Sequence, residues 1–161
     1  MSDALKLTNR LRSFALEETL PLECLFDDYV IIDKAADDGM ASTTTADAKQ
    51  WSNPFDFPVQ VVGLTYNATG GGIAANDTNY AQLQIKVDDG AGGAAALAMQ
   101  LETKITAGTG NVTANIGVST TTKQSGGTVV PVGGNLFFGI AKQGSGVIVR
   151  AGKIVVRLRR I

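Results

Sequence analysis

From residue 59 onward, apolar and polar side chains alternate along the chain with a period of two, and short runs of Gly, Ser, Thr and Asn separate the alternating stretches. This alternation is typical of strands that bury one face and expose the other. The clearest example is 80–88, in which every second side chain from Ala81 to Val87 is apolar. Comparable patterns predict strands over 59–68, 95–106, 112–119, 129–132, 135–141, 147–150 and 153–161.

The alternation also predicts which side chains face the core. We expect these sets each to share one buried face: Val62, Leu64 and Tyr66; Leu97, Met99, Leu101, Thr103 and Ile105; Val112, Ala114, Ile116 and Val118; Leu136, Phe138 and Ile140; Ile154, Val156 and Leu158. The Ala, Leu, Met and Glu content of 95–106 would also permit a helix, but the period of two favours a strand. Pro131 places 129–132 at the start of a strand or at a sheet edge.

These patterns amount to seven or eight strands at roughly even spacing, with no helix among them. The connections are too short for parallel crossovers, so the strands must pair antiparallel. Two such sheets that bury one face each make a sandwich. The sequence therefore predicts an all-β fold, an antiparallel β-sandwich of jelly-roll type, with an N-terminal arm.

Residues 1–58 follow a less regular pattern. Residues 4–18 fit either a short helix or an extended arm, and 29–32 (YVII) fit a strand. Residues 37–47 are polar and turn-like, and 51–58 (WSNPFDFP) form an apolar loop. We therefore divide the chain into residues 1–58, an arm or the first strands with their loops, and residues 59–161, the sandwich.

Charge is distributed unevenly between these two parts. The formal net charge is −1, but residues 1–58 carry 11 acidic and 5 basic side chains, whereas 59–161 carry 4 and 9. An acidic segment beside a basic one favours neutralisation within the chain or head-to-tail association between copies. Only 18% of residues are charged, against about 25% in typical domains, which is compatible with surfaces that become interfaces.

Candidate chemistry is sparse. The chain has no His and one Cys, Cys24, so the commonest acid–base group and metal ligand is missing, and we expect Cys24 to be a small apolar core residue. The pairs Asp27-Asp28 and Asp37-Asp38 would point to opposite faces of a strand, and Asp88-Asp89-Gly90 fits a turn better than a calcium loop. We expect no catalytic residue, no cofactor and no metal, hence no enzyme. Neither a signal peptide nor a membrane span is indicated.

Two groups of residues are candidates for an interface. Basic side chains gather near the C-terminus, and the alternation places Arg157 and Arg159 on one face and Arg160 on the other. These basic side chains indicate a solvated sheet edge or a surface that binds an acidic protein. A nucleic-acid-binding surface is disfavoured because no aromatic side chains lie between them in the sequence. The aromatics Trp51, Phe55, Phe57 and Tyr66 either fill the core or form an exposed binding surface. We select Trp51, Phe55, Phe57, Arg157, Arg159 and Arg160 as interface candidates.

Three segments resemble the small decoration (cement) proteins on the capsids of tailed bacteriophages: VVGLTYNAT, NDTNYAQLQIKVDDGAGG and VPVGGNLFFGIA. The resemblance covers Val59–Ile161 and implies a jelly-roll-like sandwich that forms a homotrimer on the outer capsid. Such a protein would bind other copies of itself and the major capsid protein, and it would bind neither nucleic acid nor a membrane. It would be made in the host cytoplasm. The alternative is a receptor- or carbohydrate-binding module of a phage fibre or tail; a hydrolase is disfavoured.

Overall fold

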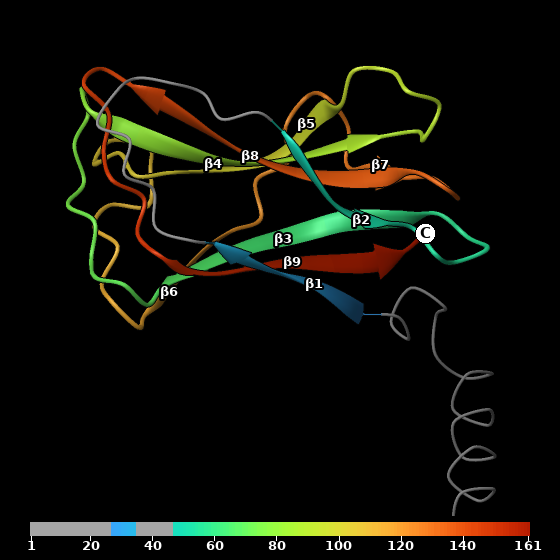
Figure 1. Cartoon of the computed structure of the whole chain (residues 1–161), viewed down its shortest axis with the longest axis horizontal. Coiled ribbons are helices and arrows are strands. Elements are labelled where there is room, and N and C mark those ends of the chain that lie inside the picture. Colours follow the sequence, from blue (N-terminus) through green and yellow to red (C-terminus); the bar gives the residue numbers. More distant parts are fainter. Residues whose placement is uncertain (1–26, 35–46) are drawn as a thin grey trace, which may run out of the picture.

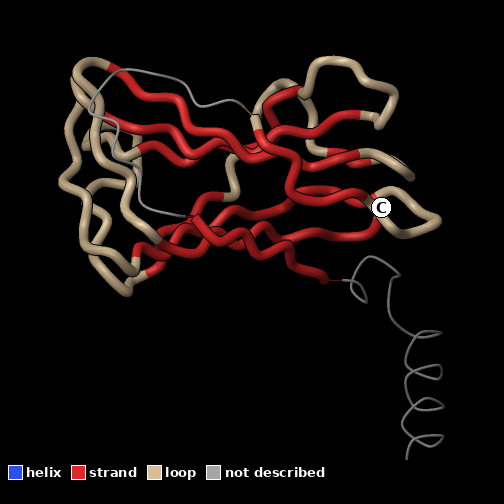
Figure 2. The backbone as a smooth tube through the Cα atoms, viewed as in Figure 1, coloured by secondary structure: helices blue, strands red, loops and turns tan. Residues whose placement is uncertain are grey.

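The computed structural model describes residues 27–34 and 47–161, and all the regular structure in these residues is β (Figures 1 and 2). The strands are β1 (Asp27–Lys34), β2 (Ala48–Ser52), β3 (Val59–Ala68), β4 (Tyr80–Asp88), β5 (Ala96–Glu102), β6 (Gly117–Thr120), β7 (Val129–Val130), β8 (Asn135–Gln143) and β9 (Gly152–Arg160). The predictions for 4–18, for Cys24 and for most of 37–47 lie outside the described residues.

The strands form two antiparallel sheets that face each other (Figure 1). Sheet A has the order β1-β9-β3-β6, with the short β7 also paired to β3, and sheet B has the order β2-β8-β4-β5. The pairs are nested: β1 with β9, β2 with β8, β3 with β6, and β4 with β5. This is the order produced when one long hairpin is rolled up into a double-sheet jelly roll. The predicted all-β sandwich is confirmed.

Segments before residue 59 belong to both sheets. β1 extends beyond the predicted 29–32 strand and pairs along its whole length with β9, from Asp27 opposite Arg159 to Lys34 opposite Gly152. β2 includes Trp51, which the sequence pattern assigned to a loop, and it pairs with β8.

The core is the layer of apolar side chains between the two sheets. The predicted inward sets of β4, β8 and β9 are all buried, because strict alternation places one side of each strand against the opposite sheet. The largest fully buried side chains include Leu64, Leu83, Ile85, Leu136, Ile140, Ile154 and Leu158. Each such side chain contributes roughly 1.5–3 kcal/mol through its removal from water.

β3 departs from strict alternation. A bulge between Val61 and Gly63 interrupts its pairing with β9. Val59 and Val61 point inward before the bulge, and Leu64 and Tyr66 do so after it. A bulge adds one residue and shifts the parity of the faces, so the sequence pattern missed Val59 and Val61. Val62, which it selected, is buried but lies outside the main core cluster.

The segment 95–106 is a strand and not a helix, but only over the seven residues of β5. Thr103 is buried as predicted, and it exchanges hydrogen bonds with Ala81: its amide donates to the Ala81 carbonyl at 3.0 Å, and its hydroxyl accepts from the Ala81 amide at 3.0 Å. The chain then leaves the sheet. Ile105 is therefore 65% exposed, and its predicted place in the core is wrong.

Two further predictions are wrong in part. The strand predicted at 112–119 is reduced to β6, because Asn115 has a φ of +62°, a left-handed conformation that ends an extended run. Ile116 is consequently 59% exposed, while Val112 is buried and forms an isolated bridge with Ile73. The segment 147–150 is not a strand, although Val149 is fully buried.

Tyr66 links this irregular segment to the core. Its ring is fully buried, and its hydroxyl donates a hydrogen bond of 2.6 Å to the carbonyl of Arg150. Burial raises the pKa of Tyr66 from 10.0 to about 12, and the positive charge of Arg150 acts in the opposite direction. The folded state therefore prefers the neutral phenol, so its contribution to stability is complete below pH 10 and is lost as the pH rises toward 12.

This linkage predicts how Tyr66→Phe behaves. At pH 8 the variant should be less stable by about 1 kcal/mol, because the hydrogen bond to the Arg150 carbonyl is lost. Between pH 10 and 12 its melting temperature should fall less steeply than that of the unmodified protein, so the two curves converge. Thermal unfolding followed by circular dichroism measures this. Identical alkaline profiles for the two proteins would refute the prediction.

Candidate functional site

Three aromatic rings gather at one end of the sandwich. Trp51 lies in β2, and Phe55 and Phe57 lie in the loop that leads from β2 to β3. The Phe55 and Phe57 rings are stacked with centroids 5.0 Å apart and an interplanar angle of 6°, and Trp51 is tilted against Phe55 at 6.2 Å. All three rings are partly buried and pack against the core. Each ring therefore has one side in the core and another near the surface.

Arg160 completes this group, which we call the aromatic–arginine cluster (Trp51, Phe55, Phe57 and Arg160). Its guanidinium lies 4.2 Å from the centroid of the Phe57 ring, a cation–π contact worth about 0.5–1 kcal/mol at a partly exposed site. The pairing of β9 with β3 explains the contact, because Arg160 is opposite Val59 and Phe57 is two residues earlier. Four of the six predicted interface residues are thus brought together.

Asn53 holds the loop of this cluster in place, and sequence reasoning missed it. The side chain is buried, and its amide nitrogen donates to the carbonyls of Phe57, Val130 and Pro131 at 3.0, 3.3 and 3.0 Å. Its side-chain oxygen accepts from the Phe55 amide at 3.0 Å. An Asn before a Pro reads as an ordinary turn signal, so only the long-range contacts with residues near 130 reveal its role.

We therefore predict that Asn53→Ala lowers the stability of the protein and loosens the loop that carries Phe55 and Phe57. The variant leaves buried carbonyls unpaired, at a cost of about 1–3 kcal/mol. Urea unfolding should show this loss, and the emission of Trp51, the one tryptophan of the chain, should shift to longer wavelength in the folded state. Gln50→Ala, at an exposed neighbouring position, should change neither. An Asn53→Ala protein with native stability and emission would contradict this assignment.

Arg157 and Arg159, the other two interface candidates, lie apart from the aromatic–arginine cluster. Both alternate with the buried Val156 and Leu158, so they point to the outer face of sheet A. Arg159 is exposed, whereas Arg157 is half-buried and its Nε atom has no hydrogen-bond partner among the described residues. Beside Arg157 is a hollow of about 190 Å³.

The outer face of sheet A is also partly apolar. Tyr29 and Ile31 of the edge strand β1 are 53% and 61% exposed. They lie opposite Arg157 and Val155 of β9. Exposed apolar side chains that adjoin one another on a sheet face are a feature of protein contact surfaces. We call the group Tyr29, Ile31, Val155 and Arg157 the sheet A patch.

The outer face of sheet B has a different character. Gln82, Gln84, Gln100 and Glu102 of β4 and β5 are hydrogen-bonded to one another, as in the bonds from the Gln84 amide to Gln100 at 3.1 Å and from the Gln100 amide to Glu102 at 2.6 Å. Such side-chain pairs satisfy each other across neighbouring strands. On β4 and β5, these outward polar side chains are therefore hydrogen-bonded to one another.

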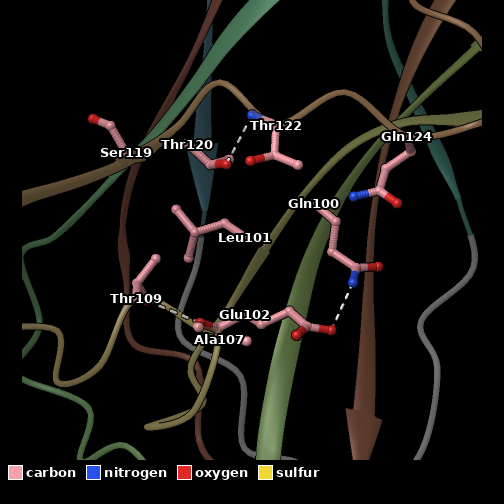
Figure 3. A pocket seen from close by; sticks show the side chains of 10 residues that line it. Gln100, Leu101, Glu102, Ala107, Thr109, Ser119, Thr120, Thr122 and Gln124 are labelled. Carbon is pink, nitrogen blue, oxygen red and sulfur yellow. Dashed lines mark hydrogen bonds between the residues drawn. The ribbon is translucent and has the colours of Figure 1, made fainter.

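A polar cleft of about 300 Å³ lies where β5, β6 and the loop after β5 meet (Figure 3). Glu102 is the one ionisable group among its lining residues, and its carboxylate already accepts from Gln82 and Gln100 and lies 3.6 Å from the Lys104 ammonium. No second carboxylate lines the cleft to act as an acid–base partner.

Asp77 fixes the loop that forms one wall of this cleft. Its carboxylate accepts from the amides of Ile105 and Thr106 and from the Thr106 hydroxyl, at 2.8–3.0 Å. These bonds, the Thr106 amide first, lower the pKa of Asp77 below its usual value. Because each bond favours the ionised carboxylate, the loop is held most firmly above the ordinary pKa of an aspartate and loosens as the pH falls.

Within 27–34 and 47–161, no three His, Cys, Asp or Glu side chains lie close enough to hold a metal ion. The same residues contain no helix long and apolar enough to cross a membrane.

Comparisons with known proteins give little further information. No protein-family model matches the chain, and no curated protein matches it in sequence. Among solved structures it is similar to one titled "Structure of infectious bursal disease virus Gx strain", with 13% identity and a TM-score of 0.25. The match covers 84% of this chain and 41% of that one, so this chain spans less than half of the other's length. The fold assignment rests on the strand order itself.

Proposed function

We propose that this protein is a structural component of a virion, a decoration protein that binds the outer surface of a capsid as a homotrimer and stabilises contacts between coat subunits. The observation that carries the proposal is the nested jelly-roll pairing of the two sheets. Double-sheet jelly rolls of this kind recur in viral capsid domains and in lectins. The sequence segments that resemble capsid decoration proteins fall on β3, β4 and β8 of this sandwich. Because one fold serves several functions, the surfaces must discriminate between them.

The surfaces favour protein partners. The sheet A patch offers apolar and cationic side chains side by side, and the aromatic–arginine cluster offers partly buried rings beside a guanidinium. Aromatic side chains and arginines are enriched at protein interfaces. Both surfaces involve β9, the last strand of the chain.

The sugar-binding alternative has less support. Tyr66, one of its candidate rings, is fully buried and has no face to offer a sugar. The other three rings pack against the core, and the polar cleft has no aromatic side chain in its lining. We also propose that the protein is not an enzyme, because the cleft holds a single carboxylate that is already occupied by its neighbours.

The oligomeric state tests the proposal directly. We expect light scattering after size exclusion to give three times the chain mass of 16.7 kDa, and we expect the trimer to co-sediment with capsids assembled from the major capsid protein of the same virus. Heat-treated protein serves as the control for non-specific sedimentation. A chain that stays monomeric at micromolar concentration and never sediments with capsids would refute the proposal.

The N-terminal segment should contribute to assembly, because the charge of residues 1–58 opposes that of the rest of the chain. Deletion of residues 1–20 should lower both the trimer fraction and capsid affinity. The sandwich should remain folded, as judged by circular dichroism and Trp51 emission. Unchanged mass and unchanged capsid affinity in the deletion variant would remove this role.

A further inference from the structure

The hollow on the outer face of sheet A is formed where three neighbouring strands place side chains of unequal size. Gly63 of β3 lies opposite Arg157 of β9, which in turn lies opposite Tyr29 of β1. Gly63 has no side chain, and a Cβ atom there would lie 3.5 Å from both the Cβ and the Nε of Arg157. Gly63, Arg157 and Tyr29 all border the hollow of about 190 Å³.

Among the described residues, no carboxylate forms an ion pair with Arg157 at this hollow. Its Nε atom is shielded from solvent and makes no hydrogen bond within the described part of the chain. A buried donor without an acceptor is unfavourable, so an acceptor supplied from outside would be bound favourably. A carboxylate matches the guanidinium best, because it accepts two parallel N–H bonds.

The surroundings of Arg157 restrict the ligand further. Tyr29 and Val155 border the hollow with apolar surface, and Ile31 extends that surface along β1. On the far side the Thr65 and Ser119 hydroxyls are hydrogen-bonded to each other at 2.8 Å. A ligand that fills this site must carry a carboxylate beside apolar groups, which is the chemistry of an acidic, leucine-rich peptide.

The chain itself contains such a peptide. Residues 16–26 (LEETLPLECLF) carry three glutamates, four leucines and a phenylalanine, with no Lys or Arg. This segment lies outside the described residues, and it directly precedes β1. Its charge is opposite to that of Arg157 and Arg159, and its leucines match the exposed Tyr29 and Ile31.

We propose that the hollow beside Arg157 binds the segment 16–26 of a second copy of this chain, with one of its glutamates paired to the Arg157 guanidinium. Opposite net charges on residues 1–58 and 59–161 favour head-to-tail association between copies, in which the acidic segment of one copy meets the basic face of the next. Around a three-fold axis each copy donates one segment and receives one, which closes the ring. This inference rests on the proposed trimer and adds its docking site.

Charge reversal tests the pairing. Arg157→Glu should weaken trimer formation about tenfold or more, measured as the dissociation constant by sedimentation equilibrium, because it places like charges in a partly desolvated contact. Lys49→Glu makes the same change in net charge on β2 of the other sheet and should leave the constant unchanged. Adding Glu17→Arg, Glu18→Arg and Glu23→Arg to Arg157→Glu should restore association. Failure of this combination to recover association, in a variant that melts as the unmodified protein does, overturns the pairing.

Cross-linking identifies the occupant without altering the site. Chains of residues 1–161 with a photoreactive phenylalanine at position 22, made in light and heavy isotope, are mixed in urea, refolded together so that both isotopes enter the same trimers, and irradiated. We expect cross-links from position 22 to the peptides that contain Tyr29 or Val155, with light–heavy pairs among them. Pairs of a single isotope only would assign the hollow to the chain's own segment and overturn the proposal.

The results also separate this inference from the proposed function. A trimer that binds capsids but is unaffected by Arg157→Glu refutes the docking site and leaves the proposed function standing. Loss of capsid binding without loss of the trimer shows that the coat protein fills the hollow, which also refutes a second copy as its occupant. An unmodified protein that is monomeric refutes both.

Discussion

The layer of apolar side chains between the two sheets is the feature on which the rest of the structure depends. Strands supply it from both sides, and Leu83, Ile140 and Ile154 are at most 1% exposed. Removing this surface from water provides the main driving force for folding. Because the layer requires two facing sheets, it also fixes which side of each strand points outward, and thereby the composition of both outer faces.

The two outer faces differ although the strands beneath them are alike. Glutamines and a glutamate on sheet B satisfy one another, so that face has little to gain from a partner. On sheet A, Gly63 and Arg157 border a hollow next to the bulge in β3. At the end of the sandwich, Asn53 ties the loop of the aromatic–arginine cluster to residues 130 and 131. Both surfaces proposed for binding therefore lie beside local irregularities and not on the regular parts of the strands.

The regular strands could be predicted from the sequence because alternation is a local property. β4, β8 and β9 have inward faces that the pattern identifies correctly, and the sandwich follows from their number and spacing. The bulge in β3, the early end of β5 before Ile105, and the turn at Asn115 could not be predicted in the same way. Each depends on contacts with distant segments, which outweigh local propensity. The candidate site shows the same limit: the pattern selected Phe57 and Arg160 separately, but their contact depends on the pairing of β9 with β3.

The position of β9 has a consequence for how the protein folds. β9 lies between β1 and β3, so β1 joins the rest of sheet A only through a strand that is distant from it in sequence. Contacts this distant in sequence form slowly, and the unpaired edges of β1 and β3 are prone to aggregation in the meantime. A chain truncated before Gly152 would have two separated edges where the complete chain has a continuous sheet. Sheet A therefore depends on β9 as a unit, because the loss of this one strand leaves β1 without a neighbouring strand.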